Sequence, residues 1–246
     1  MKFVAIDSPF IREKYLNQVK DLPQISDYFS FDDAPENQED IVRRIGDAEM
    51  ITLDIFQQIT KDVLDRTPHL KAIFSQAVGT NNIDAEYAKG LGIKVYNCPG
   101  YNANAVAEFV FALITSLFRK IPAAQAHVRA GGWMYRYFEG RELRGRTIGV
   151  IGSGNVARKV VSIARGYGMN ICVHTQNPNE KKALALEIKK FSTLKDVLKT
   201  ADFLVLCVPL TPSTKHLLGK KELALMKKTA ILVNVSVLSS LSLTSI

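Results

Sequence analysis

The stretch TIGVIGSGNVARKVVSIARGYGMNICVHT, residues 147–175, reads in order as an apolar strand, a glycine-containing turn, an amphipathic helix and a second strand. Within it, Gly152, Gly154 and Ala157 follow G-x-G-x-x-A spacing. In such a unit the first glycine permits the tight turn and the second lets the backbone approach a pyrophosphate, while the third small residue lets the helix pack closely on the sheet. The stretch therefore predicts a parallel α/β domain with a dinucleotide site.

The first turn of that helix is the expected phosphate-binding element. Its free N–H groups lie near Asn155 and Val156, and the helix dipole would favour an anion there. Glycine spacing by itself is weak, but the flanking strands and helix strengthen the prediction. Two alternatives stay open: a tight turn that binds nothing, and a site for another nucleoside cofactor such as S-adenosylmethionine.

The end of the second strand bears on the choice between NAD and NADP. An Asp or Glu at this place usually accepts both ribose hydroxyls of NAD. Here the sequence VHTQNP places Thr175 at that position, with Gln176 and Asn177 beside it. Without a carboxylate a 2′-phosphate would not be repelled, although no arginine stands next to it. Lys181 and Lys182 are within reach, so both cofactors are admissible, with a slight preference for NADP.

Short β-rich runs alternate with helical periodicity along the chain, which indicates parallel sheets with crossover helices. The expected strands are KFVAI, EMITL, KAIFSQA, IKVYN, TIGVIG, NICVHT, DFLVLCV and AILVNV, and helices are expected at residues 11–20 and 61–65. The fold class is therefore α/β, with two parallel-sheet domains of Rossmann-like or flavodoxin-like type. The predicted boundary lies near Pro99, giving domains 1–98 and 99–236 and a tail at 237–246.

A long, largely buried helix is expected from Asn102 to Lys120, ended by Pro122. It is rich in apolar positions: Val106, Phe109, Val110, Ala112, Leu113, Leu117 and Phe118. This helix would form a structural spine between the two domains.

Composition narrows the functional class. Lys and Arg outnumber Asp and Glu by 32 to 24, and much of the excess lies in residues 181–228. These lysines alternate with apolar helix positions and lack aromatic partners, so a solvated face is favoured over a nucleic-acid surface. The N-terminus has too few apolar residues before Asp7 for a signal peptide, and the polar residues after Thr229 argue against a membrane span.

The three cysteines, Cys98, Cys172 and Cys207, are odd in number and widely spaced. A disulfide framework or zinc site is therefore not expected. We interpret them as buried thiols in a reducing compartment, which predicts a cytoplasmic protein.

Three ordered motifs resemble the D-isomer-specific 2-hydroxyacid dehydrogenases, the family of D-lactate, glyoxylate/hydroxypyruvate and D-3-phosphoglycerate enzymes. They are AVGTNNIDAEYAKGLGIKVYNCPGYNANAVAEFVFALITSLFRKI, ELRGRTIGVIGSGNVA and ADFLVLCVPLTPSTKHLLGKKELALMKKTAILVNVS, within residues 68–236. The resemblance implies hydride transfer between NAD or NADP and a small 2-oxo or 2-hydroxy acid. It also implies that residues 1–98 form the substrate domain and that the cofactor domain begins at residue 99.

Site residues follow from the resemblance position by position. The amides around Val78 and Gly79 would hold the substrate carboxylate, and Tyr101 would lie near the cleft. The implied cofactor contacts are Asn155 and Val156 at the pyrophosphate, Thr175 at the ribose, Val208, Pro209 and Thr214 at the cofactor's edge, and Val235 and Ser236 at the nicotinamide end. Val208 and Val235 equally suit a strand core, and Pro209 suits a strand terminator. Asp84 and Glu108 also recur in the family signature, and we interpret them as caps or anchors.

The catalytic groups that the resemblance implies are not found. The family places an arginine directly after the N-x-x sequence, followed later by a glutamate and a histidine. Here Val237 occupies the arginine position, and the sequence ends at Ile246 before a further Glu or His. None of His69, His127, His174 and His216 is a convincing substitute.

The chain is therefore expected to be C-terminally truncated or frameshifted and impaired in catalysis. A non-catalytic nucleotide-binding regulatory or scaffold protein is the alternative; a methyltransferase-like site is disfavoured. The neutral tail after the last strand would promote self-association. The resemblance implies a homodimer formed through the spine helix and the loop around Trp133, and we expect no metal, nucleic-acid or membrane partner.

Overall fold

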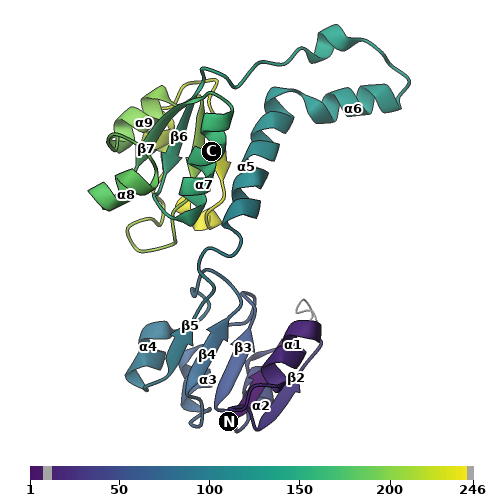
Figure 1. The fold of residues 1–246 in the computed structure, drawn as a ribbon, viewed down its shortest axis with the longest axis vertical. Coiled ribbons are helices and arrows are strands. Elements are labelled where there is room, and N and C mark those ends of the chain that lie inside the picture. Colours follow the sequence, from purple (N-terminus) through teal and green to yellow (C-terminus); the bar gives the residue numbers. More distant parts are fainter. Residues whose placement is uncertain (8–12, 243–246) are drawn as a thin grey trace. The chain divides into compact units, whose positions relative to one another are not determined.

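Two separate parallel sheets organise the chain, one in each of two structural units (Figure 1). The computed structural model describes residues 1–7 and 13–242. The first unit spans Met1–Tyr101 and the second begins at Asn102. This division falls three residues after the expected one, and Cys98 N donates to Ala77 O at 2.9 Å, which ties the connecting segment to the first unit.

The first unit is a five-stranded parallel sheet of order β2-β1-β3-β4-β5. Its elements are β1 (Lys2–Ala5), α1 (Glu13–Lys20), β2 (Asp27–Ser30), α2 (Gln38–Ile45), β3 (Met50–Leu53), α3 (Lys61–Asp65), β4 (Ala72–Ser75), α4 (Ala85–Gly90) and β5 (Lys94–Tyr96). This strand order is that of flavodoxin-like folds. It confirms the predicted α/β class for this part of the chain.

Most elements of the first unit were predicted, and three were not. The four expected strands are present, α3 has the expected bounds, and residues 11–12 of the first expected helix lie outside the described residues. The sequence reasoning missed β2, α2 and α4. The N-terminus of α2 did carry a signal, because the Asn37 side chain accepts from Asp40 N at 3.0 Å as a helix cap.

Asp7 is a buried carboxylate just beyond the end of β1, with 2% of its surface exposed. Its Oδ1 accepts a hydrogen bond from Asp54 N at 2.9 Å. Burial raises the pKa of Asp7 from 3.8 to about 6, and the neighbouring Asp54 charge adds to the rise. The ionised side chain therefore costs folding free energy at neutral pH.

Asp7→Asn is expected to stabilise the protein at pH 7 by roughly 1–2 kcal/mol, a value reduced for solvent screening near the sheet edge. The asparagine carbonyl can keep the bond from Asp54 N and carries no charge. Because the folded pKa is raised, the cost of Asp7 grows as pH rises from 3.8 and is complete above about 6. Urea unfolding of both proteins between pH 4.5 and 7.5 should show a widening difference; a constant difference would contradict the assignment.

The second unit contains a four-stranded parallel sheet of order β7-β6-β8-β9 among its described residues. Its elements are α5 (Ala103–Phe118), α6 (Ile121–Arg129), η1 (Tyr135–Phe138), β6 (Thr147–Ile151), α7 (Asn155–Gly166), β7 (Asn170–His174), α8 (Glu180–Ala185), α9 (Leu194–Thr200), β8 (Phe203–Leu206), α10 (Lys220–Leu223), β9 (Ile231–Asn234) and η2 (Leu238–Ser240). The α5 and α7 helices pack on one face of the sheet, whereas α9 covers the other. This arrangement confirms the second predicted α/β domain.

The expected spine helix differs from the observed one in two respects. Lys120 adopts a left-handed φ of 55° and separates α5 from α6, so Pro122 lies in the first turn of a new helix. Helix α5 is also buried along one face only: Phe109 and Leu117 are 58% and 60% exposed. The predicted bounds, Asn102 to Lys120, agree closely with α5, Ala103–Phe118. The predictions that this helix is largely buried and that Pro122 ends it were wrong, because a proline is well tolerated at the start of a helix.

The described part of the C-terminal tail packs against the second unit. Leu241 forms a parallel bridge with Leu218 and is 7% exposed. Ser240 is fully buried, and its Oγ donates to Val237 O at 2.8 Å. The neutral tail, which was expected to promote self-association, thus forms a short 3-10 helix followed by a buried leucine. Among the described residues, β9 pairs with β8 on one side only.

Within residues 1–7 and 13–242, no helix combines the length and apolar character needed to cross a membrane.

Candidate functional site

The glycine turn between β6 and α7 has the geometry that its sequence predicted. Gly152 has a φ of +122°, and a Cβ atom there would lie 2.3 Å from the carbonyl oxygen of Cys207. Its N–H donates to His174 O at 2.8 Å, which joins the turn to the end of β7. Only glycine combines this backbone conformation with so close an approach.

The next part of the turn faces open space. Gly154 caps α7, and a Cβ placed on it would meet no atom within 4 Å. The first bond of the helix runs from Arg158 N to Gly154 O at 3.1 Å, so the N–H groups of residues 155–157 precede the helical ladder. Ala157 is fully buried against the sheet. The turn can therefore hold an anionic group at Gly154, with the dipole of a twelve-residue helix behind it.

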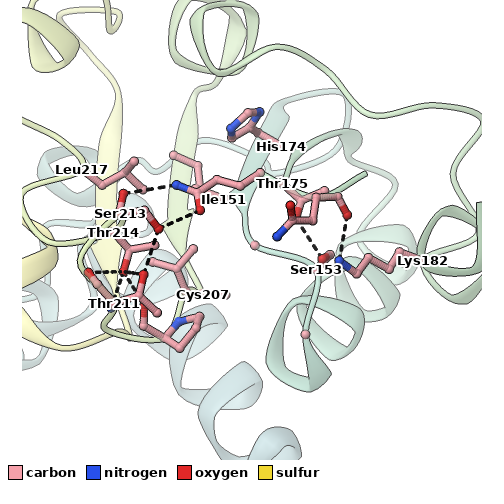
Figure 2. A pocket seen from close by; sticks show the side chains of 16 residues that line it. Ile151, Ser153, His174, Thr175, Lys182, Cys207, Thr211, Ser213, Thr214 and Leu217 are labelled. Atoms are coloured by element: carbon pink, nitrogen blue, oxygen red, sulfur yellow. Dashed lines mark hydrogen bonds between the residues drawn. The ribbon is translucent and has the colours of Figure 1, made fainter. Parts of the chain in front are cut away.

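A pocket of about 340 Å³ opens beside this turn, at the carboxyl ends of β6, β7 and β8 (Figure 2). It is lined by Ile151, Gly152, Ser153, Gly154, His174, Thr175, Gln176, Asn177, Lys182, Cys207, Val208, Pro209, Thr211, Ser213, Thr214 and Leu217. Ligands of doubly wound sheets bind at this edge. Six predicted cofactor residues are brought together here: Gly152, Gly154, Thr175, Val208, Pro209 and Thr214.

Four predicted cofactor residues are not part of the pocket lining. Asn155 and Val156 lie in the first turn of α7, where their backbone N–H groups were expected to act. Val235 and Ser236 follow β9, and the Ser236 Oγ accepts from Val208 N at 2.9 Å. Ser236 thus fixes the backbone of a lining residue.

One side of the pocket carries hydroxyl groups and a lysine. The Oγ of Ser153 lies 3.0 Å from the Oγ1 of Thr175, and Lys182 Nζ donates to Asn177 O at 2.7 Å. Figure 2 shows Ser153, Thr175 and Lys182 close together on this side. None of the sixteen lining residues, all within the described part of the chain, is Asp or Glu.

The other side is built from the segment after β8. Thr214 Oγ1 donates to Pro209 O at 2.6 Å and accepts from Thr211 N at 2.8 Å. Ser213 Oγ donates to Gln176 Oε1 at 3.1 Å, and Gln176 Nε2 donates back to Ser213 O at 3.2 Å. This reciprocal pair joins the segments that follow β7 and β8 across the pocket.

The sequence reasoning had not assigned several lining residues to the site. They are Ile151, Ser153, Cys207, Thr211, Ser213 and Leu217. Ser153 was detectable as the residue between the two glycines, and Thr211 and Ser213 lie in the third quoted motif. Burial raises the pKa of Cys207 to about 12, so its thiol stays protonated. Cys98 is exposed, and Cys172 and Cys207 are partly buried, which corrects the expectation that all three thiols are buried.

The predicted substrate residues lie in the first unit, after β4 and β5. Val78 is 43% exposed, and its carbonyl accepts from Asn97 Nδ2 at 2.6 Å. Gly79 O accepts from Ser75 Oγ at 3.3 Å, which orders the loop. Tyr101 is 66% exposed at the end of this unit.

Other residues singled out from the sequence have structural contacts. Asp84 Oδ2 accepts from Lys61 N at 3.0 Å and so caps α3. His127 Nε2 accepts from Met134 N at 3.1 Å, and His174 Nδ1 lies 3.1 Å from Ser192 O. Among residues 1–7 and 13–242, no group of three or more His, Cys, Asp or Glu side chains could hold a metal ion.

Comparison with known proteins agrees with this geometry. Residues 111–237, more than half of the chain, match the family described as D-isomer specific 2-hydroxyacid dehydrogenase, NAD binding domain. D-3-phosphoglycerate dehydrogenase of Methanocaldococcus jannaschii is 38% identical over 197 residues, which are 80% of this chain and 38% of that protein. Glyoxylate reductase of Aeropyrum pernix is 38% identical over 208 residues, which are 81% of this chain and 62% of that protein. The chain thus spans less than two thirds of either relative.

Among solved structures, an acyclic imino acid reductase in complex with NADPH and D-Arg matches with a TM-score of 0.89 and 29% identity. The match covers 100% of this chain and 77% of that one. The glycine turn, the pocket beside it and these similarities lead to one conclusion: the chain belongs to the D-isomer specific 2-hydroxyacid dehydrogenase family.

Proposed function

We propose that this chain binds a nicotinamide dinucleotide in the pocket of the second unit and belongs to an oxidoreductase acting on a small 2-oxo or 2-hydroxy acid. The observation that carries the proposal is the open space at Gly154, between the N-terminus of α7 and the pocket. A pyrophosphate there would meet the N–H groups near Asn155 and Val156. The names of the relatives, a phosphoglycerate dehydrogenase and a glyoxylate reductase, support this chemistry.

The two units would then have different roles, one in substrate binding and one in cofactor binding. Residues 1–98 would form the substrate domain, with the amides at Val78 and Gly79 holding the carboxylate and Tyr101 near the cleft. Residues 99–236 would form the cofactor domain. Thr175 would contact the ribose, whereas Val235 and Ser236 would lie toward the nicotinamide. When bound, the nicotinamide supplies the hydride acceptor or donor.

Hydride transfer also needs a cation to polarise the substrate carbonyl and a general acid for the new hydroxyl. Val237, 45% exposed, stands where the family resemblance implies that cation. We therefore propose that the 246-residue chain retains cofactor binding and is impaired in catalysis. The same observation favours a second function, that of a non-catalytic nucleotide-binding regulator or scaffold.

Fluorescence titration of the purified chain with NADH and with NADPH tests the binding proposal. We expect saturable binding of at least one of the two, with the nicotinamide emission enhanced. Absence of binding to both, in a protein whose circular dichroism shows the α/β fold, would refute the proposed function.

We also propose that the second unit forms a homodimer through α5, α6 and the segment that follows them. Figure 1 shows α6 extending away from the sheet of its own unit. Trp133, Tyr135 and Tyr137 in this segment are 87%, 70% and 68% exposed, and Leu117 on α5 is 60% exposed. Exposed aromatic side chains are enriched at protein interfaces. The unpaired cysteines accord with the cytoplasmic location that we propose.

Trp133→Ser combined with Leu117→Asp is expected to raise the dimer dissociation constant at least roughly tenfold, because it removes an exposed aromatic side chain and adds a charge to the proposed interface. Sedimentation velocity over a concentration series measures this constant. Lys159→Ser, on the exposed side of α7, serves as the control and should leave it unchanged. A monomeric wild-type chain, or equal constants in all three proteins, would disprove the interface.

A further inference from the structure

We infer that Ser153, Thr175 and Lys182 form a subsite for the 2′-phosphate of NADP, and that this chain therefore prefers NADP(H) to NAD(H). The inference rests on the proposed function, since it concerns the adenosine end of the same pocket. It assigns the choice of cofactor to a lysine on α8 rather than to an arginine next to the β7 strand end.

The three side chains meet because of the sheet register. Strands β6 and β7 run parallel, with Ile151 opposite His174, so the residues that follow them emerge at the same edge. Ser153 and Thr175 are those residues, and their hydroxyl oxygens lie 3.0 Å apart. Ser153, Thr175 and Lys182 all line the same side of the pocket (Figure 2).

Lys182 is held at both ends. Its backbone N–H donates to the Asn179 side chain at 2.9 Å, which caps α8, and its Nζ donates to Asn177 O at 2.7 Å. An ammonium group has three N–H donors, so two stay available after the bond to Asn177. Lys182 can therefore contact an anion in the pocket without leaving its present position.

The chemistry of this wall suits a phosphate better than a ribose diol. A free diol is recognised by a carboxylate that accepts from both hydroxyls, and no lining residue is Asp or Glu. Hydroxyl groups and an ammonium donate to phosphate oxygens, and the bond from a charged donor is the stronger kind. Lysine acts here as a point charge in place of the two-pronged arginine.

The neighbouring lysine provides a natural comparison. Lys181 is exposed and does not line the pocket, whereas Lys182 is half-buried and does. Both carry the same charge and adjoin each other on α8. A change at Lys181 therefore reports the general electrostatic effect of losing a cation, and a change at Lys182 reports the contact.

The test compares dissociation constants of NADPH and NADH for the wild type, Lys182→Ala and Lys181→Ala, with 2′-AMP and 5′-AMP as competitors. We expect the wild type to bind NADPH at least about tenfold more tightly than NADH, and Lys182→Ala to lose about tenfold in NADPH affinity with NADH within twofold. Lys181→Ala should change neither. In the wild type, 2′-AMP should displace NADPH better than 5′-AMP does.

Thr175→Asp gives an independent check, because a carboxylate would repel the 2′-phosphate and accept the ribose hydroxyls of NADH. It should reverse the preference. Equal affinity of the wild type for both cofactors, or equal loss of both in Lys182→Ala, would overturn the 2′-phosphate subsite and leave the dinucleotide site standing. Failure of the wild type to bind either cofactor would overturn both proposals.

Discussion

Gly154→Asp is expected to weaken binding of both NADH and NADPH at least about 100-fold, with little change in thermal stability. The position is exposed, and a Cβ there meets no atom within 4 Å, so the side chain fits the unliganded protein. Bound cofactor would place its pyrophosphate in that space. The aspartate would then repel it and also occupy the helix N–H groups near Asn155 that the phosphate needs. Cofactor fluorescence measures affinity, and circular dichroism during heating measures stability.

Two further substitutions separate space from charge. Gly154→Ala adds only a methyl group and should reduce affinity far less than Gly154→Asp. Gly152→Ala should instead destabilise the second unit, because its Cβ would lie 2.3 Å from Cys207 O at a φ of +122°. Unchanged affinity in Gly154→Asp would show that the pyrophosphate is not at this turn. Equal destabilisation by Gly154→Asp and Gly152→Ala would show that Gly154 has a packing role instead.

The sequence predicted those parts of the fold that local pattern determines. Central strands such as β6 and β8 are almost fully buried and read as short continuous apolar runs, as parallel strands do. The edge strand β2, Asp27–Ser30, has three of its four residues exposed and lacks such a run, so it was missed. The break at Lys120 was also missed, since a left-handed lysine leaves no sequence pattern.

The candidate site divides in the same way. Gly152, Gly154 and Thr175 were predicted because their roles follow from position within one strand–turn–helix–strand unit. The Gln176–Ser213 pair joins residues 37 positions apart, and the sequence alone did not indicate that contact. Lys182 was noted only as a residue within reach. Its selection over Lys181 depends on the orientation of α8, which the Asn179 cap helps to fix.

The packing of the described tail limits how the C-terminal segment can be replaced in an experiment that tests catalysis. Leu241 and Leu218 belong to the same buried cluster as Ile151, on the face of the sheet covered by α9. Leu241 therefore contributes to the packing of the unit that holds the pocket. A replacement for this segment has to supply an apolar side chain for that cluster, or the cofactor site will be lost with the fold.

The 246-residue chain is expected to reduce glyoxylate, pyruvate and hydroxypyruvate at least roughly 1000-fold more slowly than a variant whose residues 237–246 are replaced by a family-type ending. That ending begins Arg-Gly and supplies the later glutamate and histidine. The physical reason is that Val237 offers no positive charge to the substrate carbonyl, and that residues 237–246 include no glutamate or histidine to give a proton to the product. Oxidation of NADH and NADPH, followed by absorbance with each acid, measures the rates.

Partial replacements show whether the missing cation or the missing general acid limits the rate. Val237→Arg alone should tighten binding of a 2-oxo acid to the cofactor complex without restoring turnover, because this substitution supplies a cation and no general acid. The full ending with valine kept at 237 should bind cofactor normally and stay slow, since the carbonyl would not be polarised. Each variant must first show wild-type cofactor affinity, which separates lost chemistry from a disrupted fold around Leu218 and Leu241. Rapid turnover by the unmodified chain would disprove the role assigned to position 237 and would exclude a purely regulatory function.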